Sequence, residues 1–333
     1  MEAVEKPGPA GRNSRLIGLG LFFVGLIIGG AAVSVSSGYT STTSTVTVTA
    51  GNSSVPVLKV LATFFPLRDW AVAVGGNRAD VSLLVPVGID VHSFEPSPAD
   101  LEAIARTNVL ILNGAGLEPW APAAIATADN PHLIVVNGSL GINLIYVPPQ
   151  FQAGNRVYDP HIWNDPVDAI AIVKNILAGY IQADPSDEAF FTSNANAYIN
   201  ALQALNQEFV SLSTSQLAIR KFVTFHTAWA YFAQQYNLTQ IPVFGPFEES
   251  PTVADIQNVV NVINQNKLCY VGYESLENPA ISEAIASQTH ATLVPMDPNE
   301  GLTDQQAAVG ETYLTMMQMM LFIMSLALNH VGC

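Results

Sequence analysis

A long stretch without glycine or proline separates two strand-rich parts of the sequence. It runs from Asp187 to about Lys221 and places apolar residues, among them Phe190, Leu202 and Phe209, at helical spacing. Such spacing indicates an amphipathic helix, and about 30 residues at 1.5 Å per residue extend ~45 Å, the span of a domain. The sequence therefore predicts one long helix that joins two folded lobes.

Short apolar runs typical of buried strands occur on both sides of this helix. They are VPVLKVLATF, ADVSLLVP, NVLILNG and HLIVVNG before it, and KFVTFH, TQIPVFG, LCYVGYE and ATLVPMD after it. Helix-capping patterns at Ser97 to Asp100 and at Asp165 to Asp168 alternate with the strands. This alternation predicts an α/β fold of mostly parallel sheets flanked by helices. We expect an N-terminal lobe at 55–186, a linking helix at 187–220 and a C-terminal lobe at 221–333.

The final apolar segment, TYLTMMQMMLFIMSLALNH, could be taken for a membrane span. It is only about 17 residues long, whereas a span needs about 20, and it contains Gln318. We expect a buried terminal helix instead.

The amino terminus carries the signal for the cellular compartment. Residues 16–35 form an uncharged apolar run of membrane-spanning length, and Lys6, Arg12 and Arg15 precede it. Because basic residues stay on the cytoplasmic side, this order predicts a cytoplasmic segment at 1–15, a transmembrane anchor and an extracytoplasmic body. A cleaved secretion signal is the alternative interpretation.

Residues 36–54 are almost entirely Ser, Thr, Gly and Val, a composition that buries too little surface to fold. We expect a flexible stalk between the membrane and the body. Glycosylation sequons occur at Asn52, Asn137 and Asn237, and an extracytoplasmic location makes them candidate modification sites.

Charge and cysteine content narrow the possible partners. The chain has 12 basic and 27 acidic side chains and a net charge of −15. Nucleic acid is therefore not an expected partner, whereas small cations are expected. Two cysteines cannot form a four-sulfur metal site. We expect Cys269 to be a small core residue and Cys333 to lie at a frayed terminus, in preference to a disulfide between them.

Three of the six histidines share one setting, near the ends of predicted strands and beside capped helices: His92, His161 and His226. Asp297 follows the last predicted strand in the same way. Open α/β sheets bind ligands beyond the carboxyl ends of their strands. Two of these residues fall in each lobe, and three imidazoles with one carboxylate suit a divalent ion such as zinc. The pattern predicts a metal site in the cleft between the lobes.

A single histidine at a strand end is more often a hydrogen-bonded loop residue than a metal ligand. The predicted metal site therefore depends on the four residues acting together. Glu274 is the alternative to Asp297 as fourth ligand. Possible hydrogen-bond partners of the ligand imidazoles are Asp90, Asp159 and Asp165. The remaining histidines are expected to be surface or structural residues: His132, His290 and His330. Two tryptophans beside the candidate ligands are expected in the cleft wall or core: Trp163 and Trp229.

Several segments, in this order, resemble one family over about residues 56 to 330. They are ATFFPLRDWAVAVGGNRADVSLLVPVGIDVHSFEPSPADL, NVLILNGAGLEPW, DPHIWNDP, TFHTAWAYFAQQYNL, FEESPTVADI and LVPMDP. The chain resembles the cluster A-I solute-binding proteins, the zinc- and manganese-binding components of ABC importers. The resemblance implies a rigid two-lobed fold with a single linking helix and a metal site between the lobes.

In that family the ligand motifs are matched here by His92, His161, His226 and Asp297. A histidine at the third position resembles the zinc-associated members, with manganese the next expectation. The resemblance implies a monomeric binding protein, not an enzyme, that hands its metal to a membrane permease.

The chain departs from the family in three respects. The stretch PPQFQAGNRVYDP lacks the histidines of the His-rich loop found in many zinc members. A membrane segment and stalk replace the lipid anchor, as in archaeal binding proteins. Asn164 stands where the family pattern often has an apolar residue.

Two other functions use the same residues. A secreted zinc hydrolase needs three protein ligands, a bound water and a general base, and the sequence has no HExxH motif. A closed site with four protein ligands favours binding over hydrolysis. A metal-binding surface adhesin is the third interpretation.

Overall fold

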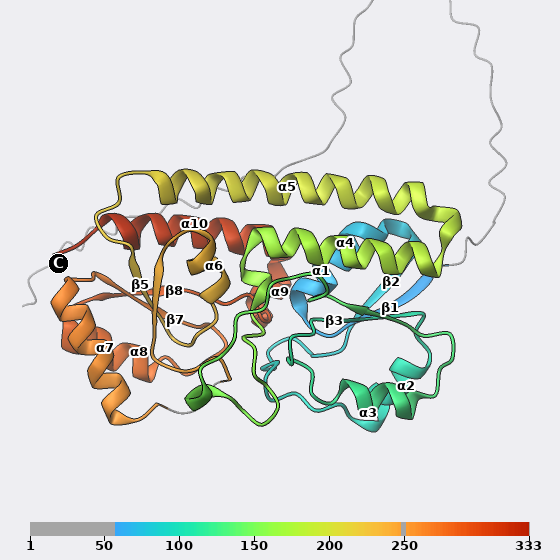
Figure 1. Ribbon diagram of the computed structural model, residues 1–333, viewed down its shortest axis with the longest axis horizontal. Helices are drawn as coiled ribbons and strands as arrows, with labels where there is room; N and C mark the ends of the chain where they lie inside the picture. The colour runs from blue at the N-terminus through green and yellow to red at the C-terminus, as the bar shows by residue number, and fades with distance from the viewer. Residues whose placement is uncertain (1–56, 248–250, 333) are drawn as a thin grey trace, which may run out of the picture. The chain divides into compact units, whose positions relative to one another are not determined.

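A computed structural model describes residues 57–247 and 251–332 (Figure 1). The predicted cytoplasmic segment, anchor and stalk lie outside these residues, as do Asn52 and Cys333. Among the helices that the structure describes, none is long and apolar enough to cross a membrane. The bounds predicted above for the two lobes stay predictions, and the elements are described one by one below.

The N-terminal half contains a four-stranded parallel sheet in the order β2-β1-β3-β4. Its strands are β1 Leu58–Ala62, β2 Ala79–Leu83, β3 Val109–Leu112 and β4 Ile134–Asn137. The central strand β3 is buried along its whole length, as expected where helices cover both faces. Because all four strands run in parallel, the loops that carry His92 and His161 leave from the same edge of the sheet.

The C-terminal half repeats this arrangement with two parallel strand pairs. They are β5 Lys221–Thr224 with β6 Thr239–Pro242, and β7 Tyr270–Tyr273 with β8 Thr292–Pro295. Strand β5 lies beside β7. The alternation of strands and helices predicted from the sequence is therefore confirmed in both halves.

The two capping patterns predicted from the sequence do begin helices. Ser97 and Asp100 form a capping box at the start of α2, and Asp165 accepts a hydrogen bond from the backbone of Val167 at the start of α4. The α-helices are α1 Phe65–Gly75, α2 Pro98–Ala105, α3 Ala121–Ala128, α4 Pro166–Ala183, α5 Glu188–Thr214, α6 Ala230–Gln235, α7 Val253–Asn266, α8 Ala280–Thr289, α9 Asp304–Val309 and α10 Tyr313–Asn329. Short 3-10 helices are Gly76–Arg78, Pro149–Phe151, Ile162–Asn164 and Pro185–Asp187.

Helix α5 is the predicted long helix. Its 27 residues extend ~40 Å, and Figure 1 shows it passing both groups of strands. One face, from Phe191 through Leu202 to Phe209, is buried and packs against α1, α4 and α10. The helix ends at Thr214, several residues before the predicted end, and strand β5 begins at Lys221. A single rigid helix thus supports structure from both halves of the chain.

Helix α10 is the buried terminal helix expected from the sequence. Tyr313, Met317, Met324 and Leu328 line its buried face. The opposite face is open to solvent at Met319.

Cys269 corrects an expectation. It is buried and disulfide-bonded, not an unmodified core thiol. Leu268 pairs with Val331 in an antiparallel bridge, so the carboxyl-terminal residues lie beside the start of β7.

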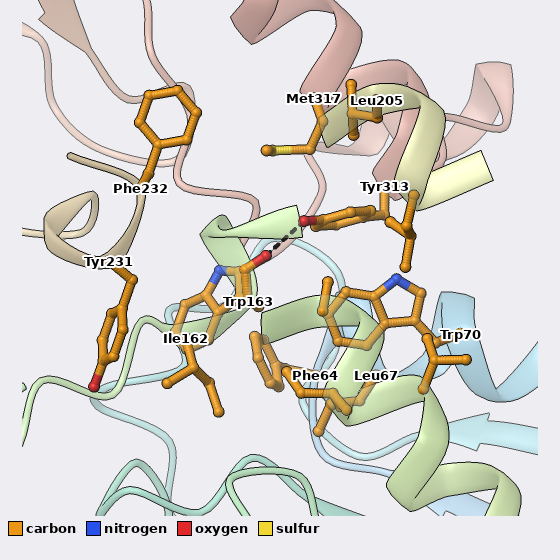
Figure 2. Close-up of a cluster of buried hydrophobic side chains, with 14 of the residues drawn as sticks. Phe64, Leu67, Trp70, Ile162, Trp163, Leu205, Tyr231, Phe232, Tyr313 and Met317 are labelled. Carbon is orange, nitrogen blue, oxygen red and sulfur yellow. Dashed lines mark hydrogen bonds between the residues drawn. The ribbon is translucent and has the colours of Figure 1, made fainter. Parts of the chain in front are cut away.

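A cluster of buried apolar and aromatic side chains surrounds Trp163 (Figure 2). The rings of Phe64 and Trp163 meet edge to face with centroids 4.7 Å apart, and those of Trp70 and Tyr313 with centroids 4.9 Å apart. The Tyr313 hydroxyl donates to the Trp163 carbonyl at 2.6 Å. Trp163 and Trp229 are fully buried, so both belong to the core. The chain two residues after His161 is therefore fixed by packing from both halves.

The close packing of α4 on strand β4 can be tested at Gly179. A Cβ atom at this position would overlap the side chain of Val136, which has little rotational freedom. We expect Gly179→Leu to lower the free energy of unfolding by about 1–3 kcal/mol through overpacking. Denaturant unfolding of the purified chain measures this. Ala178→Leu on the exposed side of the same helix is the control, and an equal loss in both variants would contradict the packing explanation.

Candidate metal centre

Four side chains that are far apart in the sequence bring their ligand atoms together in the structure: His92, His161, His226 and Glu300. The His161 Nε2 atom lies 3.3 Å from His92 Nε2 and 3.1 Å from His226 Nε2. The Glu300 Oε1 atom lies 3.4 Å from His92 Nε2, 3.1 Å from His161 Nε2 and 3.2 Å from His226 Nε2. The cluster therefore contains all three histidines predicted from the sequence.

Each half of the chain supplies two of the four side chains, as expected for a site between them. His92 lies in the loop after β2, and His161 immediately precedes the 3-10 helix that leads into α4. His226 comes two residues after β5, and Glu300 follows β8. All four positions lie beyond the carboxyl ends of parallel strands, where α/β sheets bind ligands.

Two further carboxylates fix the orientation of two of the imidazoles. The Asp159 Oδ1 atom accepts from His161 Nδ1 at 2.7 Å, and the Glu274 Oε1 atom accepts from His226 Nδ1 at 2.7 Å. Because an ionised carboxylate only accepts, Nδ1 carries the hydrogen and Nε2 presents its lone pair to the centre. The partner role predicted for Asp159 is confirmed.

The electrostatics of the cluster favour positive charge at its centre. Burial acts to lower the pKa of His161, but the carboxylates of Asp159 and Glu300 outweigh it and the pKa is raised. Burial also acts against the charge on His226, whose pKa Glu274 and Glu300 raise well above its ordinary value. For Glu300, burial raises the pKa and the neighbouring His92 and His226 lower it, and the net result is a pKa well below the ordinary value. A proton or a metal cation can supply this positive charge.

Asp297, the fourth ligand predicted from the sequence, lies outside the cluster. Its Oδ1 atom accepts from the Ser275 backbone at 2.6 Å, and its Oδ2 atom accepts from the Ser275 hydroxyl at 2.8 Å and from the Gln306 side chain at 3.3 Å. Burial raises the pKa of Asp297. The acidic side chain in the cluster is Glu300, which follows Asn299 in a left-handed backbone conformation (φ 59°). In the sequence, Glu300 is the next acidic residue after Asp297, in the segment MDPNEG.

The other candidates occupy supporting or distant positions. Glu274, the alternative fourth ligand, is the partner of His226 and is not in the cluster. Asp90 accepts from the backbone amides of His92 and Ser93 and so shapes that loop. Asp165 caps α4 and contacts no ligand imidazole in the described residues. Outside the cluster lie His132, His290 and His330.

The cluster has the dimensions of a four-coordinate metal site. A tetrahedral zinc ion with bonds of ~2.0 Å holds its ligand atoms ~3.3 Å apart. The separations given above fall on either side of that value, between 3.1 and 3.4 Å. The side chains of His161 and His226 are fully buried, and Glu300 is only 8% exposed. The arrangement can bind a divalent ion with four protein ligands, and it leaves no coordination position for a reacting water.

Curated proteins of known role are similar to this chain over most of its length. The high-affinity zinc uptake system protein ZnuA of Bacillus subtilis (strain 168) is 28% identical over 271 residues, which are 78% of this chain and 84% of that protein. The zinc-binding lipoprotein AdcA of Streptococcus pneumoniae serotype 4 is 27% identical over 271 residues, 78% of this chain. The chain spans about half the length of that AdcA protein, 54%.

Solved structures share the fold and point to the same family. The Zn(II)-bound ZnuA-like domain of Streptococcus pneumoniae AdcA aligns with a TM-score of 0.72 and 26% identity, covering 82% of this chain and 100% of that one. The laminin-binding protein Lmb of Streptococcus agalactiae, titled a bifunctional protein with adhesin and metal transporting activity, aligns with a TM-score of 0.73 and 26% identity over 81% of this chain and 99% of that one. A family model described as zinc-uptake complex component A, periplasmic, matches residues 60–325, and the chain belongs to this family.

Proposed function

We propose that this protein captures zinc outside the cytoplasm, as a monomer, and delivers it to the permease of an ABC importer. The observation that carries the proposal is the closed set of three imidazoles and one carboxylate, His92, His161, His226 and Glu300, at tetrahedral separations. Members of the family are metal-binding components that work with a permease, and the protein is not an enzyme. The metal is its cargo.

The ligand set favours zinc over manganese. Three neutral imidazole nitrogens and one carboxylate oxygen are borderline-soft ligands that suit four-coordinate zinc, whereas manganese favours oxygen ligands in six-coordinate sites. The zinc named in the relatives supports the same choice. The missing His-rich loop does not alter the four-residue set, because no residue of PPQFQAGNRVYDP belongs to it.

The alternatives left open by the sequence receive less support. A hydrolase needs a water on the metal, and four protein ligands with buried side chains leave no position for one. Adhesion is part of the printed title for Lmb and is said of that protein alone.

We further propose that residues 16–35 anchor the chain in the membrane and that residues 36–54 are the stalk. The uncharged run and the basic residues before it support this arrangement. The chain expressed in its native membranes is expected to stay in the pellet after alkaline carbonate extraction. Recovery of a shortened chain in the soluble fraction would indicate a cleaved signal instead.

Metal content measured on the full chain, purified in mild detergent, tests the proposed site. We expect one zinc ion per chain by native mass spectrometry. Glu300→Gln removes the charged ligand, and we expect it to weaken zinc binding by at least about 100-fold, the upper range for losing only an outer partner of a ligand. His92→Ala is expected to do the same.

Asp297→Asn is the matched control for Glu300→Gln, because it changes a half-buried carboxylate three residues away that lies outside the cluster. We expect near-normal zinc affinity in this variant. Loss of zinc in Asp297→Asn with retention in Glu300→Gln would restore Asp297 as the ligand. A wild-type chain that binds no zinc would refute the proposed function.

Zinc affinity is expected to rise with pH. The metal needs the unprotonated Nε2 atoms, and the raised pKa values of His161 and His226 mean that protons compete already above the ordinary histidine value of about 6.5. As the pH falls through this range, affinity should fall about tenfold per pH unit for each proton displaced. Competitive zinc titration at a series of pH values measures the slope.

Glu274→Gln provides the control for this pH dependence. It keeps an oxygen that accepts from His226 Nδ1 but removes the charge that raises the pKa of His226. The affinity curve of this variant is expected to shift to lower pH. An unchanged curve would mean that protonation of His226 does not compete with the metal.

A further inference from the structure

The side chain of Asn164 occupies the junction between the segments that carry the ligands. It is fully buried and ends the 3-10 helix Ile162–Asn164, three residues after His161. Its Nδ2 atom donates to the Ala228 carbonyl at 2.9 Å. Its Oδ1 atom accepts from the Asn299 side chain, also at 2.9 Å. A single amide therefore joins three separate segments through two hydrogen bonds.

Each bond reaches a residue within two positions of a member of the cluster. Ala228 lies two residues after His226, and its backbone amide donates to the His226 carbonyl at 3.0 Å. Asn299 directly precedes Glu300. The segments of His161, His226 and Glu300 are thus tied to one side chain, whose hydrogen bonds go to residues outside the four-residue cluster. Only the segment of His92 lies outside this network.

The neighbouring Trp163 forms a parallel connection. Its indole Nε1 atom donates to the Pro298 carbonyl at 2.7 Å, two residues before Glu300. The two side chains together hold the Glu300 loop from the N-terminal half of the chain. Asn164 differs from Trp163 because it also reaches the His226 loop.

We propose that Asn164 is a positioning residue that sets the separation between the two halves at the metal site, and that it thereby favours tetrahedral zinc over six-coordinate ions. This inference rests on the proposed function. A hydrogen bond fixes its two heavy atoms within about 2.7–3.2 Å, whereas an apolar contact tolerates sliding. Breaking either hydrogen bond would leave a buried donor or acceptor without a partner, which costs free energy. Both bonds of Asn164 are therefore favoured in the folded protein. The ligand separations then stay near those that zinc needs.

The test compares Asn164→Leu with the wild-type chain in mild detergent. Leu has a similar size and cannot form either bond. We expect zinc affinity to fall about 10–100-fold, as for the loss of outer partners of metal ligands. Manganese affinity is expected to fall less, so the ratio of zinc affinity to manganese affinity should decrease. Competitive titration with each ion measures both values.

Bound cobalt(II) reports on the coordination geometry of the metal site. If Asn164 contributed only to the stability of the fold, its replacement would not alter that geometry. Tetrahedral Co²⁺ absorbs visible light far more strongly than six-coordinate Co²⁺, because the two geometries differ in symmetry. We expect the visible bands of the cobalt-loaded chain to weaken in Asn164→Leu. Unchanged bands and an unchanged ion ratio would overturn the proposal, even if the variant unfolds at a lower temperature.

Asn175→Leu is the matched control. The Asn175 side chain also donates to two backbone carbonyls, those of Gly138 at 2.9 Å and Leu140 at 3.0 Å, but outside the metal centre. We expect this variant to lose stability and to keep its zinc affinity and cobalt spectrum. An equal loss of zinc affinity in both Asn variants would show general destabilisation and overturn the positioning role.

Asn299→Gly is the second variant, for the case in which Asn164→Leu does not fold. Gly adopts the left-handed backbone of this position without strain. The change removes the bond between Asn299 and Asn164, together with the weaker contact of the Asn299 Nδ2 atom with the Met317 sulfur at 3.2 Å. We expect a smaller shift in the same direction. If the wild-type chain binds no zinc, the proposed function fails; if it binds zinc and both Asn164→Leu and Asn299→Gly match it, only the positioning role fails.

Discussion

The arrangement of this protein depends on four electron-pair donors that meet in a buried space. The hydrogen bonds to Asp159 and Glu274 turn the Nε2 lone pairs of His161 and His226 toward the centre, where the ionised Glu300 also points. In a medium of low polarity these groups repel one another unless positive charge lies between them. A proton can provide that charge, since the pKa values of His161 and His226 are raised, and a divalent ion can replace it. Capture of the metal is therefore an exchange of charges inside a fixed cage.

A cage of this kind needs a rigid frame, and the packing supplies one. Residues 161–164 form its centre, because His161 is followed at once by Trp163 and Asn164, which bond to the other half of the chain. The Tyr313 hydroxyl holds the same segment from α10. Helix α5 packs along α1, α4 and α10 and so ties elements of both halves to one support. The cost of bringing the ligand atoms together is offset by this large apolar core.

Local patterns in the sequence predicted most of the fold and three quarters of the candidate site. Capping residues such as Ser97 and Asp165 mark helix starts by hydrogen bonds within three residues, and strand ends place histidines at a shared edge. Glu300 was missed for a different reason. The carboxylate of Asp297 accepts a hydrogen bond from the backbone of Ser275, which lies 22 residues away in the sequence. The left-handed turn at Asn299 directly precedes Glu300, the acidic side chain that lies in the cluster. Contacts of that range leave no periodic signal, and the same holds for the disulfide at Cys269.

The closed geometry also limits how a bound ion can leave. With His161 and His226 fully buried and Glu300 only 8% exposed, a bound ion would be enclosed by its ligands, and moving the two halves apart would open this enclosure. Separation removes His226 and Glu300 together, because both belong to the same half, and leaves only His92 and His161. Two imidazoles hold zinc far more weakly than four ligands, so a small displacement changes a tight site into a weak one. The bonds of Asn164 and Trp163 between the halves oppose such a displacement and so add to the stability of the four-ligand site.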